Sequence, residues 1–128
     1  MSRSDTIQKI EKNKIIVITR GIYGEELLRL SEALYEGGIR AFEITYDPAD
    51  PNTLDTIKKN VEALDAKFQG KLLLGVGTVL NREQVRNAKE AGAKFIVSPN
   101  FSRAVVEETL EQGLVSMRDD TDRNLRGR

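Results

Sequence analysis

Five short apolar runs, separated by amphipathic stretches, most constrain how this chain can fold. The runs occupy residues 14–19 (KIIVIT), 41–45 (AFEIT), 71–75 (KLLLG), 94–98 (KFIVS) and 114–117 (LVSM). Most contain β-branched or aromatic side chains, and all show little alternation of polar and apolar residues. Such runs are typical of strands that are buried on both faces of a sheet. We therefore predict five buried strands.

The four stretches between the runs have the period of a helix, and they cover residues 24–37, 53–68, 82–91 and 103–112. Their apolar stripes are Leu27, Leu30 and Leu34, then Leu54, Ile57, Val61 and Leu64, then Val85, Ala88 and Ala91, and finally Val106 and Leu110. Asn81 and Ser102 are predicted to cap the last two helices at their N-termini. Glycines close three of the helical patterns, as expected for left-handed C-caps.

The order of elements is a strand and a helix, repeated four times, followed by a fifth strand. Right-handed crossovers between such units give a parallel sheet with the helices outside. The predicted fold class is therefore α/β, built from parallel (β/α) units. Periodicity does not decide whether the sheet stays open or closes into a barrel.

Composition excludes several kinds of chemistry. The chain of 128 residues has no cysteine and no histidine, so thiolate nucleophiles, disulfides and cysteine-based zinc sites are ruled out. We expect no metal site and no cofactor. Lys plus Arg equals Asp plus Glu at 20 each, so no net field attracts nucleic acid or an anionic membrane. The apolar runs are far shorter than the roughly 20 residues of a membrane span. We expect a cytoplasmic protein with no nucleic-acid or membrane partner.

Polar residues follow or interrupt the predicted strands near their carboxyl ends, where parallel α/β folds bind ligands. Glu43 lies inside an apolar strand, where desolvation would raise the pKa of its carboxyl group and suit it to acid–base catalysis. Arg20 ends the first strand and has a guanidinium that can bind a carboxylate or phosphate with two hydrogen bonds.

Two further strands end in candidate binding residues. Thr78 follows Gly75-Val76-Gly77. The two glycines have no side chain and would let a ligand approach the backbone closely. Pro99, Asn100 and Phe101 follow the fourth strand and are placed to face the same cavity.

Each candidate also has a structural interpretation. Glu43 can pair with Arg20 or a lysine, and its spacing favours neither role. A surface ion pair is the commoner role for an isolated arginine, and the glycine stretch alone reads as a tight turn. The segment after the fourth strand can be an ordinary loop. The functional interpretation depends on the joint placement of these residues at four successive strand ends.

The motifs ITRG, EGGIRAFEIT, GVGTVL and FIVSPN occur in an order and with gaps that resemble the 2-keto-3-deoxy-6-phosphogluconate and 2-keto-4-hydroxyglutarate aldolases. The 6-phosphogalactonate enzymes belong to the same group. The resemblance covers roughly residues 10–117. It implies a TIM-type (β/α)₈ barrel, of which about four and a half of eight units are present here, and a homo-oligomer, usually a trimer. It also implies a class I aldolase that cleaves 2-keto-3-deoxy-6-phospho sugar acids to pyruvate and an aldehyde through a lysine Schiff base.

The resemblance implies a role for each candidate. Glu43 is the expected general acid/base, and Arg20 and Thr78 are expected near the carboxylate and keto end of a small keto acid. Pro99, Asn100 and Phe101 are expected to line the pocket.

The sequence departs from the family pattern in two ways. Asp47 lies near a position where many members carry an arginine, and the loop YDPADP is closer to the galactonate type. The Schiff-base lysine of the family lies on the sixth strand, which this chain does not reach. We therefore expect the truncated chain to be inactive alone.

The last eleven residues, RDDTDRNLRGR, differ in character from the rest. Seven are charged and only Leu125 is apolar. We predict half a barrel at residues 1–117 and an aberrant charged tail at 118–128. Two added C nucleotides after the Met117 codon can convert the tail to the family-like PGTIPTEIFAG, so we hypothesise an out-of-frame translation that the coding DNA would test. A divergent tail or an engineered half-barrel is the alternative.

Three functions stay open at this stage. The chain can be a segment of an aldolase, a non-catalytic half-barrel that binds keto acids or anions or self-associates, or half of another phosphate-using barrel.

Overall fold

Five strands form one parallel sheet in the order β1-β2-β3-β4-β5. In the computed structural model, which describes residues 2–13, 15–99 and 102–118, the strands are β1 (Val17–Thr19), β2 (Ala41–Thr45), β3 (Leu73–Gly77), β4 (Phe95–Ser98) and β5 (Val115–Arg118). Each strand pairs with the next one along the chain. This sequential order is the one found in (β/α) barrels. The predicted α/β fold with parallel units is confirmed.

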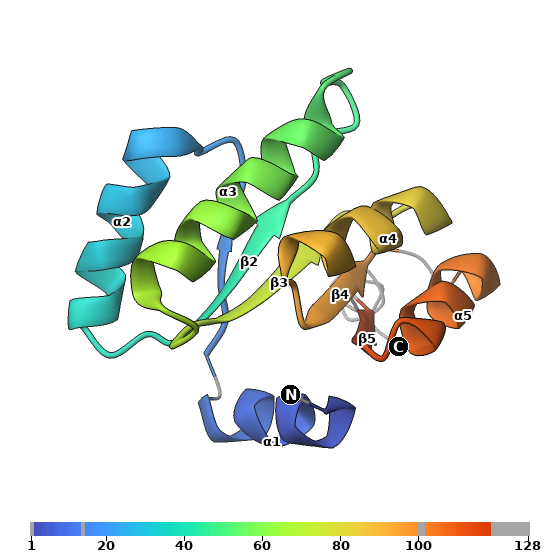
Figure 1. Ribbon diagram of the computed structural model, residues 1–128, viewed down its shortest axis with the longest axis horizontal. Helices are drawn as coiled ribbons and strands as arrows, with labels where there is room; N and C mark the ends of the chain where they lie inside the picture. The colour runs from blue at the N-terminus through green and yellow to red at the C-terminus, as the bar shows by residue number, and fades with distance from the viewer. Residues whose placement is uncertain (1, 14, 100–101, 119–128) are drawn as a thin grey trace, which may run out of the picture.

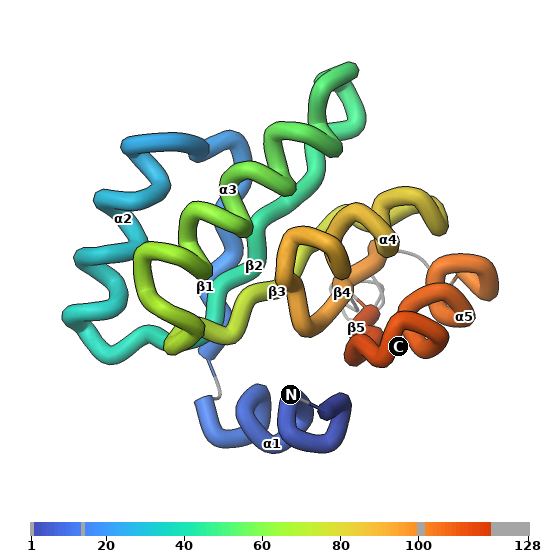
Figure 2. Tube along the Cα trace, in the orientation of Figure 1, coloured from blue at the N-terminus to red at the C-terminus, as the bar shows by residue number. Residues whose placement is uncertain are grey.

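Four helices lie together on one face of the sheet, and a fifth lies apart from them (Figure 1). The four are α2 (Gly24–Glu36), α3 (Thr53–Phe68), α4 (Arg82–Ala91) and α5 (Arg103–Glu111). The fifth, α1 (Arg3–Asn13), lies beneath the end at which the chain enters the strands, as the tube view also shows (Figure 2). The sequence analysis did not predict α1.

Every second side chain along the strands faces the helices, and these side chains form the larger core. Phe42, Ile44 and Tyr46 from the β2 region pack there with Ile57 and Val61 of α3, and all five are at most 1% exposed. The predicted stripes of α3 and α4 account for most of the helical share of this core. Because successive side chains of a strand point to opposite faces, Ala41, Glu43 and Thr45 of β2 lie on the other face of the sheet.

The opposite face carries a second, smaller core at the amino ends of the strands. Ala41, Leu73, Phe95 and Val115 form one layer there, and Ile10 of α1 packs against it. Ser2 and Asp5 begin α1 with reciprocal hydrogen bonds, Asp5 N–H to Ser2 Oγ at 3.1 Å and Ser2 N–H to Asp5 Oδ2 at 3.2 Å. The helix covers the amino end of the half-barrel.

Several local predictions are confirmed. Asn81 Oδ1 accepts a hydrogen bond from the Gln84 N–H at 2.8 Å, and Ser102 Oγ accepts one from the Val105 N–H at 3.4 Å. Gly92 ends α4 with φ of 109°, a left-handed conformation that a side chain would disfavour.

Two local predictions are wrong. The strand β3 begins and ends two residues later than predicted, so Gly75 and Gly77 lie inside the strand and do not form a turn. The buried face of α5 consists of Val105, Glu108 and Thr109, whereas Leu110 is 45% exposed. Glu108 is buried because partners on α4 satisfy its carboxylate, and a hydrophobic stripe cannot reveal such a contact.

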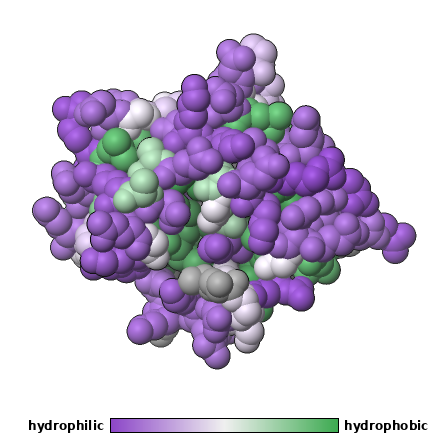
Figure 3. Space-filling model, viewed as in Figure 1, coloured by the Kyte–Doolittle hydropathy of each residue, from purple (hydrophilic) through white to green (hydrophobic). Residues whose placement is uncertain are grey.

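The face that carries α2 to α5 is mostly hydrophilic, with separated apolar areas between the helices (Figure 3). Within the described residues, no helix combines the length and the apolar character needed to cross a membrane.

Candidate active site

Glu43 projects from β2 to the inner face of the sheet, away from the four outer helices. Its strand neighbours in register are Ile18 of β1 and Gly75 of β3. The side chain is 6% exposed, and Thr45 Oγ1 donates a hydrogen bond to Glu43 Oε2 at 3.4 Å. The Glu43 carboxylate is therefore buried against the inner face of the sheet, where a bound ligand would contact it.

Gly77 makes room for that carboxylate. A Cβ atom built at Gly77 would lie 1.8 Å from Glu43 Oε2, far inside contact distance. Gly75 likewise makes room for an aromatic ring in the layer below, where a Cβ would lie 2.3 Å from the ring of Phe95. Gly75 and Gly77 thus leave room for inner side chains from the neighbouring strands, and the approach of a ligand to their backbone stays a prediction.

A hollow of about 240 Å³ opens over Glu43 at the carboxyl ends of the strands. The residues that line it are Ile16, Ile18, Arg20, Glu43, Thr78, Val97, Pro99, Met117 and Arg118. Four of the six predicted site residues, namely Arg20, Glu43, Thr78 and Pro99, are thus brought to one cavity. Asn100 and Phe101 lie outside the described residues.

Thr78 borders the hollow directly after β3 and holds an unusual backbone conformation. Its φ is 56°, which is rare for a β-branched residue. Such conformations cost on the order of 1–3 kcal/mol and are retained mainly where the surroundings require them. The conformation holds Thr78 at the rim of the hollow beside Glu43.

Arg118 is a lining residue that the sequence analysis missed. It is the last residue of β5 and pairs in register with Ser98 of β4. Arg118, like Arg20, lies at the carboxyl end of a strand, which is where the sequence analysis looked for ligand-binding residues. It was instead assigned to the predicted tail because the residues that follow it are highly charged. Two guanidinium groups, Arg20 and Arg118, therefore border a cavity that contains one buried carboxylate, and such groups suit an anionic ligand.

Arg20 also borders a second hollow of about 180 Å³, with Tyr23, Thr45 and Asp47 among its lining residues. The Tyr23 hydroxyl donates a hydrogen bond to the Thr45 carbonyl at 3.3 Å. Burial raises the pKa of the Tyr23 hydroxyl, and the negative charge of Asp47 raises it further. Tyr23 is thus a neutral donor and acceptor at neutral pH.

Fold and site together define the class of this molecule: a segment of a parallel (β/α) barrel with a hollow at the carboxyl ends of its strands. A model of the KDPG and KHG aldolase family matches residues 6–117. The chain belongs to this family.

Relatives and solved structures agree with that assignment. The 2-dehydro-3-deoxy-phosphogluconate aldolase of Treponema pallidum is 37% identical over 109 residues, which are 84% of this chain and 48% of the relative. A probable 2-dehydro-3-deoxy-6-phosphogalactonate aldolase of Rhizobium meliloti is 35% identical over 104 residues, 80% of this chain and 46% of the relative.

A crystal structure of KDPG aldolase from Legionella pneumophila, with pyruvate captured as a covalent carbinolamine, matches with a TM-score of 0.67 and 28% identity. The match covers 87% of this chain and 51% of that one. The chain thus spans about half the length of the curated relatives it matches.

Proposed function

We propose that this chain carries the keto-acid-binding and acid–base residues of a class I aldolase. The reaction is cleavage of a 2-keto-3-deoxy-6-phospho sugar acid to pyruvate and an aldehyde phosphate. The observation that carries the proposal is the buried Glu43 carboxylate in the same hollow as Arg20 and Thr78. Family membership and the names of the relatives support the same reaction class.

In this proposal Arg20 and Thr78 bind the keto-acid end of the substrate. The Arg20 guanidinium donates two parallel hydrogen bonds to the substrate carboxylate, and the Thr78 hydroxyl donates a further one. The lining side chains Ile18, Val97 and Met117 cover the apolar part of a small keto acid.

Glu43 transfers the protons. When the C3–C4 bond breaks, the C4 hydroxyl loses a proton as it becomes the aldehyde, and C3 later gains one to form the methyl group of pyruvate. A single carboxylate beside both carbons can accept the first proton and supply the second. The electron pair of the broken bond passes to the imine of the Schiff base, whose lysine the family resemblance places on a later strand.

A polypeptide of these 128 residues is accordingly expected to bind pyruvate without cleaving the sugar acid. Borohydride reduction in the presence of pyruvate, followed by mass spectrometry, is the measurement. We expect no covalent adduct, and an adduct on any lysine would contradict the expected inactivity.

Binding tests the site itself. We expect pyruvate to shift the amide NMR signals of Gly77 and Thr78 in the labelled chain. Arg20→Ala should weaken binding at least about tenfold, because a hydrogen bond to a charged group contributes roughly 1.5–3 kcal/mol. Arg29→Ala, at an exposed position on α2, is the matched control and should leave binding unchanged. Equal binding by the wild type and Arg20→Ala would refute the assigned role of Arg20.

A second candidate function is a non-catalytic half-barrel that binds keto acids or anions, or that self-associates. It is favoured by the exposure of Ile15, which precedes β1, and of Ile18 within β1, at 58% and 59%. The homotrimeric state and the cytoplasmic location stay predictions.

A further inference from the structure

Another hollow, lined mainly by polar residues, lies at the opposite end of the strands from Glu43. Its volume is about 210 Å³, and the described residues that line it are Lys9, Lys12, Asn13, Arg40, Lys71 and Leu73. Three of these belong to α1, and the other three belong to β3 and to the segments leading into β2 and β3. The hollow is therefore formed where α1 meets the amino end of the sheet.

The charge in this hollow is one-sided. Four of its six described lining residues are cationic and none is acidic, although the whole chain carries equal numbers of acidic and basic residues. None of the ion pairs among the described residues involves these four cations, although Lys9 interacts electrostatically with the Asp5 carboxylate one turn earlier on α1. Like charges gathered in this way repel one another unless an anion lies between them.

Arg40 is held in a fixed orientation. Its Nη1 donates to the Tyr35 carbonyl at 2.7 Å and to the Ile39 carbonyl at 3.0 Å. The guanidinium also stacks on the Tyr35 ring, 3.6 Å from the ring centroid. A donor that is already ordered loses little entropy when a ligand binds.

Leu73 forms an apolar wall on one side of the hollow. It is 3% exposed and belongs to the inner layer of Ala41, Phe95 and Val115. The hollow has a volume of about 210 Å³. That space admits a tetrahedral anion together with some of its hydration.

We propose that this hollow binds a phosphate group, either as inorganic phosphate or as the phosphoryl group of a small phosphomonoester. The lysine ammonium groups and Arg40 supply charge-assisted donors, and a dianion offsets their mutual repulsion. Because Lys12 lies on α1 and Lys71 precedes β3, the bound anion joins the helix to the sheet. The site takes no part in the proposed keto-acid binding, which occurs at the other end of the strands.

Titration of the full 128-residue chain with inorganic phosphate, followed by amide NMR at constant ionic strength in chloride, tests the proposal. We expect saturable shifts at Asn13, Lys71 and Leu73 with smaller ones at Gly77 and Thr78. Glycerol phosphate in a parallel titration distinguishes a phosphomonoester from the free ion. Phosphate is also expected to raise the urea midpoint, since a ligand that binds only the folded state stabilises it.

The double variant Lys12→Gln/Lys71→Gln should weaken phosphate binding at least tenfold. Its matched control is Lys59→Gln/Lys89→Gln, which removes the same charge from exposed positions on α3 and α4 and should bind as the wild type does. Retained binding in the first variant, or equal losses in both, would overturn the proposal. Shifts spread evenly over all lysine positions would do the same.

A second measurement needs no variant. Phosphate should protect Lys12 and Lys71 of the wild-type chain from an amine-modifying reagent, read by peptide mass spectrometry, and should leave Lys59 and Lys89 reactive. Equal modification with and without phosphate would also refute the site.

Discussion

Gly75 and Gly77 show how two glycines of one strand can serve different purposes. A side chain at Gly75 would meet the ring of Phe95, which is fully buried in the inner core, and one at Gly77 would meet the carboxylate of Glu43. The ring cannot move without disturbing its whole layer. The carboxylate is the end of a flexible side chain that borders a hollow, so it can move aside.

We therefore expect the two alanine variants to differ. Gly75→Ala should lower the free energy of unfolding by about 1–3 kcal/mol, the usual effect of overpacking a core. Gly77→Ala should cost less stability but displace Glu43. Urea unfolding measures the first effect. Gly37→Ala, whose Cβ would lie 3.4 Å from the Leu34 carbonyl oxygen, is the control and should change stability by about 0.5 kcal/mol or less.

A double variant separates the two causes. If the carboxylate of Glu43 is what meets the new methyl group, Glu43→Ala should remove the stability cost of Gly77→Ala. An unchanged cost in the Glu43→Ala background would show that the methyl group meets something else.

The strand-end rule predicted much of the candidate site at the residue scale. It selected Arg20, Glu43, Thr78 and Pro99 because parallel strands bring their carboxyl ends to one edge. It could not reveal that Gly77 accommodates Glu43, since this requires the register of β2 against β3. The catalytic and binding roles of these residues stay predictions.

At the scale of elements, prediction succeeded where a segment carries its own hydrophobic period. The helices α2, α3 and α4 have that period, the strands are continuous apolar runs, and the caps of α4 and α5 use local side-chain hydrogen bonds. The helix α1 was missed because only Ile10 and Thr6 serve its packing, although the Ser2–Asp5 spacing is a start signal. The buried face of α5 was misassigned because it depends on ion pairs with α4.

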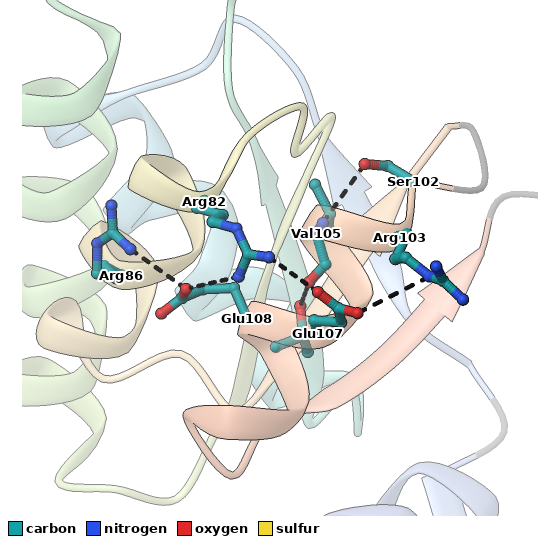
Figure 4. A network of polar contacts seen from close by, with 8 residues as sticks. Arg82, Arg86, Ser102, Arg103, Val105, Glu107 and Glu108 are labelled. Atoms are coloured by element: carbon teal, nitrogen blue, oxygen red, sulfur yellow. Dashed lines mark hydrogen bonds and ion pairs between the residues drawn. The ribbon is translucent and has the colours of Figure 1, made fainter.

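Those ion pairs form one network between α4 and α5 (Figure 4). Glu108 Oε1 lies 3.1 Å from Arg82 Nη1 and 3.2 Å from Arg86 Nη1. Gln112 Nε2 donates to Glu108 Oε2 at 2.8 Å, and Arg82 also contacts Glu107 at 2.9 Å. The network joins two neighbouring helices whose buried apolar residues, Val85 and Ala88 of α4 and Val105 of α5, belong to the same core.

The network makes stability depend on pH in a defined direction. The hydrogen bond from Gln112, followed by the contacts with Arg82 and Arg86, lowers the pKa of the Glu108 carboxyl below its ordinary value of about 4.5, against the opposing effect of burial. The folded state therefore favours the ionised form. Its contribution is fully present above that ordinary value and is lost as the pH falls through the lower folded-state pKa.

We expect Glu108→Gln to be less stable than the wild type at pH 7 and the difference to shrink steadily between about pH 5 and pH 3. Urea midpoints across this range provide the measurement. Glu111→Gln removes a carboxylate from the same helix outside the network and serves as control. A difference between the wild type and Glu108→Gln that stayed constant with pH would argue against the stabilising role of the carboxylate.

At the scale of the whole molecule, the described sheet has an edge strand on each side. Within the described residues, β1 pairs only with β2, and β5 pairs only with β4. Relatives of about twice this length share the matched segment. The inner apolar side chains Ile16, Val97 and Met117 are only partly buried, and an open strand edge beside apolar surface favours pairing with another chain.

We therefore expect the 128-residue chain to self-associate through the β1 edge. Ile18 belongs to that edge strand and is 59% exposed, so Ile18→Lys should weaken association at least tenfold by placing a charge where a neighbouring strand would dock. Light scattering over a range of concentrations gives the measurement. Leu110→Lys changes a side chain on α5 that is 45% exposed and should associate as the wild type does. A monomer at every concentration, or equal effects of the two substitutions, would rule out this edge as the contact.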